Sequence, residues 1–212
     1  LDDAEIRRMV THGVKAATNP ESNMKRASGI SPVPRLLDQG ITVGLGTDGC
    51  ASNNNLDLLE EMDTTAKLHK VGAMDPTVMD AFTVLKMATL SGAKALGMAE
   101  RIGSLEAGKK ADVIVVDTRK PHLTPMYNPY SHLVYAAKGS DVSHSVINGR
   151  LVMEDRKLLT LDLREVLGRL EAQPDPALGG PVREKRDDLA RDGRQVDVAA
   201  RGLDALRFQA RE

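Results

Sequence analysis

A short apolar run from Ile41 to Leu45, followed at once by Gly46-Thr47-Asp48-Gly49, is the feature that most constrains the fold of this chain. A short, mainly apolar run of this kind is typical of a strand buried on both faces, as in the parallel sheets of α/β proteins. Asp48 then stands just beyond the carboxyl end of that strand, where α/β barrels carry their chemistry. The sequence therefore predicts an α/β fold with a candidate functional carboxylate at a strand tip.

A second strand is expected from Val14 to Thr18, because Asn19-Pro20 ends it: proline cannot donate to a ladder and asparagine favours turns. We predict a loop after Asn19-Pro20 and then a short helix from Pro32 to Gln39, stopped by Gly40. Strand, helix and strand joined by tight links form a parallel, right-handed unit, so both strand ends face the same side. We therefore expect the Asn19 loop to lie beside Asp48.

Other elements follow from hydrophobic spacing and from turn residues. Helices are expected from Asp2 or Asp3 to Gly13, from Leu56 to Val71, from Thr77 to Leu90 after Asp75-Pro76, from Ser91 to Met98 and from Leu161 to Leu170. Strands are expected at Asp112–Asp117, His132–Ala136, His144–Ile147 and Leu151–Glu154, with Asn148-Gly149 as a hairpin turn.

These elements suggest three regions. Residues 1–102 read as an α/β segment, and residues 103–173 as a mainly β segment with a closing helix. Residues 174–212 hold sixteen charged residues, eight of each sign, and few large apolar side chains. A segment of that composition cannot bury a core, so we expect a solvated or disordered tail.

Composition excludes several classes of partner. The 29 basic and 30 acidic residues nearly cancel and form no stripe of one sign, so we expect neither nucleic acid nor a membrane surface as a partner. No apolar run reaches the roughly 18 residues that a membrane helix needs. Cys50 is the single cysteine, which excludes an internal disulfide and favours a cytoplasmic location. A small-molecule substrate suits such a chain.

Three blocks, taken together, resemble the amidohydrolase superfamily. They are Asn19–Lys25, Gly46–Asp57 and Gly103–Asp117, in that order along the chain. The first two are most similar to the aminohydrolase branch, which contains deaminases of S-adenosylhomocysteine and 5'-methylthioadenosine and related chlorohydrolases. The resemblance covers roughly Leu1 to Leu170.

The resemblance implies the C-terminal part of a metal-dependent (β/α)8 TIM-like barrel, plus the C-terminal part of a small flanking β domain. Val14–Thr18 and Ile41–Gly46 would be the seventh and eighth barrel strands. It implies a hydrolase of non-peptide carbon–nitrogen bonds that deaminates an adenosine derivative, or a similar aminated ring, with metal-activated water. Asp48 would be both a ligand of one divalent ion, Zn or Fe, and the catalytic proton acceptor.

Ser22 and Asn23 are candidate substrate-binding residues, because polar groups at strand tips can orient a polar ring. The alternative is that they close a turn through their own hydrogen bonds. Both readings stay open at this point.

The chain departs from the superfamily pattern in its histidines. The other metal ligands in that family are a His-x-His pair and two single histidines on earlier strands. None of the five histidines here fits those positions, and His69 is expected on an exposed helix face; the five are His12, His69, His122, His132 and His144. One carboxylate cannot hold a catalytic zinc, which usually has three protein ligands.

We therefore expect residues 1–212 alone to be inactive and, since Leu1 is not Met, to be a C-terminal fragment. The alternative is a catalytically dead scaffold, or a subunit that completes a barrel supplied by another polypeptide. The unpaired edges of a partial sheet also predict self-association.

Overall fold

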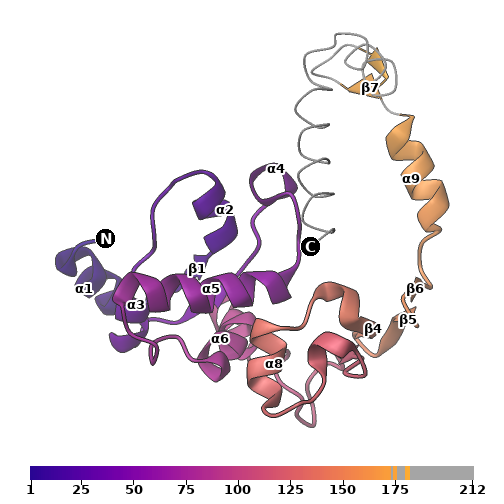
Figure 1. Ribbon diagram of the computed structural model, residues 1–212. Helices are drawn as coiled ribbons and strands as arrows, with labels where there is room; N and C mark the ends of the chain where they lie inside the picture. The colour runs from indigo at the N-terminus through magenta and orange to yellow at the C-terminus, as the bar shows by residue number, and fades with distance from the viewer. Residues whose placement is uncertain (173, 176–179, 182–212) are drawn as a thin grey trace, which may run out of the picture. The chain divides into compact units, whose positions relative to one another are not determined.

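The structure is a computed structural model that describes residues 1–172, 174–175 and 180–181 (Figure 1). The chain divides into two compact units, Leu1–Leu159 and Thr160–Glu212. The tail expected from 174 to 212 lies almost entirely outside the described residues, and the boundaries expected at 102/103 and 173/174 stay predictions. None of the described helices is long and apolar enough to span a membrane.

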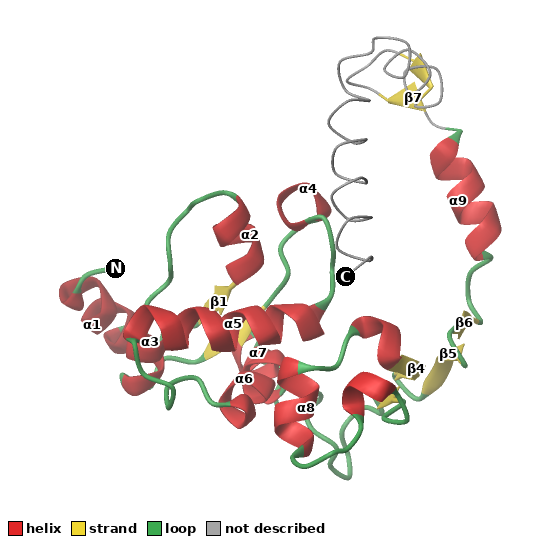
Figure 2. Cartoon of the chain, viewed as in Figure 1, coloured by secondary structure: helices red, strands yellow, loops and turns green. Residues whose placement is uncertain are grey.

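The first unit contains the parallel strand pair that the sequence predicts (Figure 2). Strand β1 (Ala16–Thr18) pairs with β2 (Val43–Leu45) in parallel, with Ala16 opposite Val43. Before them, α1 (Asp3–Thr11) begins at an Asp2 cap and is followed by Gly13 at φ +60°, as expected. Between the strands, α3 (Val33–Asp38) confirms the expected helix. The two strand ends therefore face the same side.

The loop predicted after Asn19-Pro20 is wrong in part, because a short helix, α2 (Pro20–Lys25), starts there. Asn19 is its N-cap residue and Pro20 its first residue. Proline suits that position, since its φ is already helical and its missing N–H is not needed there. The same dipeptide that ends the strand thus starts a helix.

Helices dominate the stretch after β2. A short helix that the sequence did not predict, α4 (Cys50–Asn53), precedes α5 (Leu58–Ala73), α6 (Ala81–Ala88) and α7 (Leu90–Ala95). The start expected for α6 at Asp75-Pro76 is wrong. Asp80 caps it instead, because its carboxylate accepts hydrogen bonds from the backbone nitrogens of Phe82 and Thr83 at 3.0 and 3.2 Å.

The β segment forms an antiparallel sheet in the order β3-β4-β5-β6. Its strands are β3 (Val113–Val116), β4 (Val142–Ile147), β5 (Arg150–Glu154) and β6 (Lys157–Leu158). The predicted Asn148-Gly149 hairpin turn is confirmed, and both residues have the positive φ that a type I′ turn needs.

The strand predicted at His132–Ala136 is wrong, because these residues belong to α8 (Pro129–Tyr135) and its C-cap. The Asn128 side chain caps this helix by accepting from Ser131 N at 3.1 Å. The helix packs against α5 and α6, and Val134 is fully buried. The β-branched residues here serve a helix because an Asn-Pro start and a helical packing partner outweigh their strand preference.

The remaining described elements are two single turns, η1 (Pro121–Leu123) and η2 (Gly139–Asp141), and the described part of the second unit. In that unit α9 (Leu163–Glu171) confirms the last predicted helix, and β7 (Pro174–Asp175) pairs with β8 (Gly180–Pro181).

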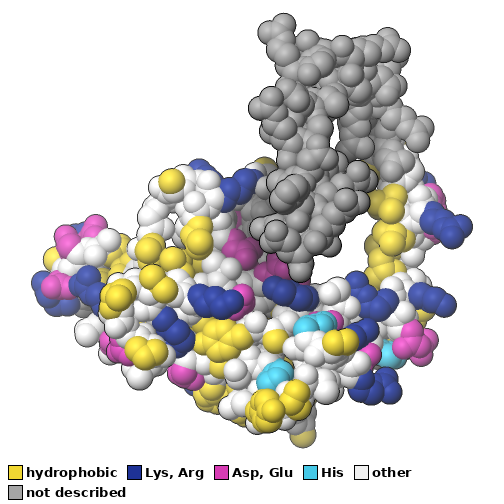
Figure 3. All heavy atoms as spheres, viewed as in Figure 1, with side chains coloured by type: hydrophobic (Ala, Val, Ile, Leu, Met, Phe, Trp, Pro, Cys, Tyr) yellow, Lys and Arg dark blue, Asp and Glu magenta, His cyan; other side chains and the backbone are white. Residues whose placement is uncertain are grey.

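The core of the first unit combines side chains of β2, of helices before and after it, and of the β segment. Close packing at one point requires glycine: a Cβ on Gly44 of β2 would lie 3.1 Å from the Cα of Gly92 in α7. The parallel sheet holds two strands, so the described residues form an open segment of a sheet and not a closed barrel. Figure 3 shows basic and acidic side chains interspersed on the visible face.

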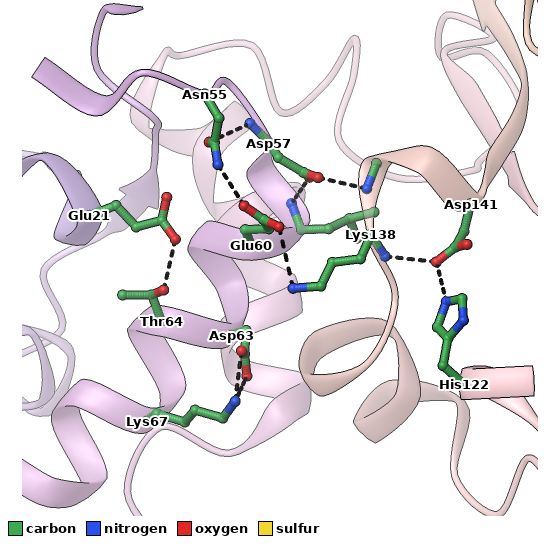
Figure 4. A network of polar contacts seen from close by, with 12 residues as sticks. Glu21, Asn55, Asp57, Glu60, Asp63, Thr64, Lys67, His122, Lys138 and Asp141 are labelled. Carbon is green, nitrogen blue, oxygen red and sulfur yellow. Dashed lines mark hydrogen bonds and ion pairs between the residues drawn. The ribbon is translucent and has the colours of Figure 1, made fainter. Parts of the chain in front are cut away.

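A polar network joins the start of α5 to the turn before β4 (Figure 4). The Asp57 carboxylate accepts from Leu59 N at 2.9 Å and from Gly139 N at 2.7 Å. Beside it, Asp141 accepts from the backbone nitrogen of Lys138 at 2.9 Å and pairs with His122 at 2.8 Å. The start of α5 is therefore held by Gly139, which lies more than 80 residues further along the chain.

We expect Gly139→Ala to destabilise the first unit by about 1.5–3 kcal/mol, the scale for losing a part-buried hydrogen bond to a charged group. The φ of Gly139 is not left-handed, but a Cβ there would lie 2.8 Å from Asp57 Oδ2. Urea unfolding measures the change. Gly72→Ala is the matched control: nothing lies within 4 Å of its Cβ position in α5, so it should be neutral or stabilising. Equal stability of the two variants would contradict the proposed role of the contact.

Candidate active site

Asp48 lies just past β2 and has an unusual backbone conformation. Its φ is +61°, in the left-handed region that residues other than glycine rarely adopt. Aspartate tolerates this region better than most residues, but such a conformation still costs of order 1 kcal/mol and persists only where the surroundings hold it. The contacts of the turn therefore decide how Asp48 is presented.

The Asp48 carboxylate accepts three hydrogen bonds. Oδ2 accepts from the hydroxyls of Ser22 and Ser52 at 2.7 and 2.8 Å, and Oδ1 accepts from Gly49 N at 2.8 Å. These bonds, the one from Ser22 first, lower the pKa of Asp48 to about 2. The exposed side chain is thus ionised at neutral pH and fixed in direction.

The structure brings Ser22 directly to Asp48. Ser22 lies in α2, is 1% exposed and gives its hydroxyl to the carboxylate. Asn23 is half-buried, and its backbone bonds to Asn19 and Ser28 within the same segment. A contact of Ser22 or Asn23 with substrate stays a prediction.

Asn19 bridges the ends of the two strands. With its amide oriented by its hydrogen-bond partners, the side-chain nitrogen donates to the carbonyls of Thr18 and Gly46 at 3.0 Å each. The amide lies so near that a Cβ on Gly46 would meet it at 2.7 Å. Glycine at 46 is therefore needed for this close approach.

Two residues that stabilise the Asp48 turn through hydrogen bonds were not predicted from the sequence, Asn53 and Glu61. The Asn53 side-chain nitrogen donates to Thr47 O and to Glu61 Oε1, both at 2.8 Å. Glu61 Oε2 accepts from Glu21 N at 3.3 Å. A signal was present: Glu61 interrupts a helical stripe, three residues after Leu58 and four before Thr65, where a charge is unexpected.

Glu61 is fully buried, and this burial, with the nearby charge of Glu21, raises its pKa to about 7. The hydrogen bonds from Glu21 N and Asn53 act in the opposite direction. Near neutral pH this carboxyl group is therefore close to its own midpoint.

The histidines lie away from Asp48 in their contacts. His69 was expected on an exposed face, and this is wrong: it is 4% exposed in α5, and desolvation lowers its pKa. The rings of His122, His132 and His144 bond to Asp141, to the carbonyls of Asn128 and Pro125, and to Ser143. Among the described residues no three His, Cys, Asp or Glu side chains are grouped so as to hold a metal ion.

The raised pKa of Glu61 predicts a pH dependence of stability. The pKa of Glu61 in the unfolded chain is 4.5. The stability that Glu61 contributes to the fold is therefore fully present below pH 4.5 and is lost as the pH rises through about 7. The shift corresponds to a loss of up to about 3 kcal/mol relative to Glu61→Gln. Urea unfolding of both proteins from pH 4.5 to 8 measures the difference. His69, whose lowered pKa acts in the opposite direction, is common to both and cancels. A pH-independent difference would contradict the prediction.

Known proteins are similar to this chain over about 80% of its length. Residues 1–152 match the model of the amidohydrolase family. The chain is 64% identical, over 170 residues, to a 5-methylthioadenosine/S-adenosylhomocysteine deaminase of Syntrophobacter fumaroxidans; the match covers 80% of this chain and 39% of that relative. The chain thus spans about two fifths of the length of the curated relatives it matches.

Two solved structures are similar. An adenosine deaminase from Xanthomonas campestris with bound zinc has a TM-score of 0.78 at 41% identity, covering 80% of this chain and 38% of that one. An atrazine chlorohydrolase from Arthrobacter aurescens, complexed with zinc, has a TM-score of 0.74 at 28% identity, with the same coverage. They confirm the expected fold class, part of an amidohydrolase barrel with part of its β domain. The chain belongs to the amidohydrolase family.

Proposed function

We propose that this chain supplies the strand-tip carboxylate of a metal-dependent aminohydrolase that removes the amino group of an adenosine derivative. The observation that carries the proposal is the Asp48 site: an ionised carboxylate, held by three hydrogen bonds at the end of β2. The deaminase name of the 64% identical relative supports the substrate class.

Asp48 has two proposed roles, as a metal ligand and as a proton acceptor. In the reaction, water adds to the ring carbon that bears the amino group, a base takes a proton from that water and passes it to the amino nitrogen, and the carbon–nitrogen bond breaks to release ammonia. A carboxylate with a pKa of about 2 is a weak base at neutral pH, whereas its full charge suits a divalent cation. The low pKa of Asp48 therefore supports the ligand role more directly than the base role.

The residues present do not fit a complete metal site. A catalytic zinc usually has three protein ligands, and the described residues hold no group of three His, Cys, Asp or Glu side chains that could bind a metal ion. We therefore derive no reaction step through the metal. Zinc, or iron in its place, would take its remaining ligands from outside this chain, because the rings of His122, His132 and His144 bond elsewhere. His69 is buried in α5, and His12 is the exposed C-cap residue of α1.

The rest of the proposal concerns the setting of the site. Ser22 or Asn23 is proposed to contact the substrate, a purine nucleoside derivative or a similar ring. Residues 1–102, 103–173 and 174–212 are proposed as barrel segment, β segment and tail. We also propose a cytoplasmic location and self-association of the chain, on the arguments from Cys50 and from unpaired strand edges.

The first test uses the chain itself. We expect residues 1–212 with added zinc to release no ammonia from 5'-methylthioadenosine or S-adenosylhomocysteine, because one carboxylate cannot hold a catalytic zinc. A coupled ammonia assay and equilibrium dialysis of zinc measure this. Turnover by the chain alone would contradict the incomplete-site argument.

The second test restores the missing part. Residues 1–152 replace the matching segment of the Syntrophobacter deaminase, and the hybrid should deaminate adenosine derivatives. Asp48→Asn should lower kcat/KM by at least about a thousandfold, the scale for losing a first-rank catalytic group. Asp38→Asn, an exposed carboxylate in α3, is the matched control and should leave activity unchanged.

Two results of this test would count against the proposal. Near-normal activity of the Asp48→Asn hybrid would remove the assigned role. A folded hybrid without activity would favour the alternative, a catalytically dead scaffold.

A further inference from the structure

We infer that Glu61 is a positioning residue, which holds the two strand-tip segments in the register that places Ser22 against Asp48. Its two carboxylate oxygens contact different segments. Oε2 accepts from the backbone nitrogen of Glu21 at 3.3 Å, and Oε1 accepts from Asn53 at 2.8 Å. One buried side chain of α5 is thus bonded to the segment after β1 and to the segment after β2.

On the β1 side, Glu61 acts at the first turn of α2. The backbone nitrogen of Glu21 donates to Glu61, and Glu21 is the residue just before Ser22. The position of this nitrogen therefore sets where the Ser22 hydroxyl lies. A second contact secures the same turn: Thr64, one helical turn after Glu61, donates to the Glu21 carboxylate at 2.9 Å. Helix α5 therefore fixes the start of α2.

On the β2 side, Glu61 acts through Asn53. The Asn53 nitrogen that bonds to Glu61 also donates to Thr47 O at 2.8 Å, directly before Asp48. This bond restrains the peptide that leads into the left-handed conformation of Asp48. Because that conformation is costly, the turn needs such external support.

The chemistry of the site requires a carboxylate. Two N–H donors converge on Glu61, one on each oxygen, and a carboxyl group, unlike an amide, offers an acceptor at both. Glutamine has the same shape, but its NH2 group would face one of the donors. Glu61→Gln should therefore break one of the two contacts while it removes a buried charge, so positioning and overall stability should move in opposite directions.

Lys25 of α2 also joins the same segments, and its contacts are weaker. It donates to Ala51 O at 3.2 Å and to the Asn54 side chain, but both contacts are exposed to solvent. Exposed charged contacts contribute little, so Lys25 cannot replace Glu61.

The functional consequence of this inference rests on the proposed role of Asp48, but its test does not. Amide hydrogen exchange is measured by NMR on the full chain, comparing Gly49, whose N–H bonds to Asp48, with Val84 in the core helix α6. Glu61→Gln and, separately, Asn53→Ala should raise exchange at Gly49 about tenfold relative to Val84, as expected for freeing a hydrogen-bonded turn.

Thr65→Val is the matched control, because Thr65 is a buried polar residue of the same helix that bonds within the helix, to Glu61 O at 2.6 Å. It should leave the Gly49-to-Val84 ratio unchanged. An unchanged ratio in both Glu61→Gln and Asn53→Ala would overturn the inference, as would a ratio that rises equally in Thr65→Val. If Glu61→Gln does not fold, Asn53→Ala alone decides, since Asn53 is the link to the turn.

The outcomes keep the two proposals apart. Loosening of Gly49 with an inactive hybrid enzyme would leave Glu61 as a positioning residue and remove the role of Asp48. If Asp48→Asn loses activity but Gly49 does not loosen in Glu61→Gln or Asn53→Ala, the role of Asp48 stands and the positioning role of Glu61 is removed.

Discussion

The parallel pairing of β1 with β2 is the constraint on which the candidate site depends. Because the strands run in the same direction, Asn19 and Gly46 meet at one edge, and their close approach is possible only because residue 46 has no side chain. This brings α2 beside the Asp48 turn, so the Ser22 hydroxyl reaches a carboxylate 26 residues away. No local interaction in either segment could produce that contact.

Helix α5 stabilises this arrangement through hydrogen bonds to both segments. It carries Glu61 beneath both strand tips, and its first turn is tied by Asp57 to the turn before β4. A buried carboxylate costs stability, as its raised pKa shows, and this cost is offset only because both oxygens are satisfied by N–H donors. The helix thus couples the β segment, the core and the candidate site within the first unit.

The site is an incomplete one by its chemistry. Asp48 is oriented and ionised, but the described residues hold no group of three His, Cys, Asp or Glu side chains that could bind a metal ion. The chain spans about two fifths of its curated relatives and yet keeps an ordered Asp48 turn. Local hydrogen bonds from Ser22, Ser52 and Gly49 fix the orientation of the carboxylate.

The sequence alone determined the parallel unit, the strand-tip position of Asp48, most helices and the Asn148-Gly149 turn, because hydrophobic period and turn residues act over a few positions. It failed at His132–Ala136, where packing against α5 and α6 outweighed strand propensity, and at His69, whose burial depends on its neighbours. Only the tertiary structure decided the contact of Glu61 with Glu21 and the partner of Ser22. These join segments 26 to 40 residues apart, and a hydrogen bond over such a distance has no periodic trace in the sequence.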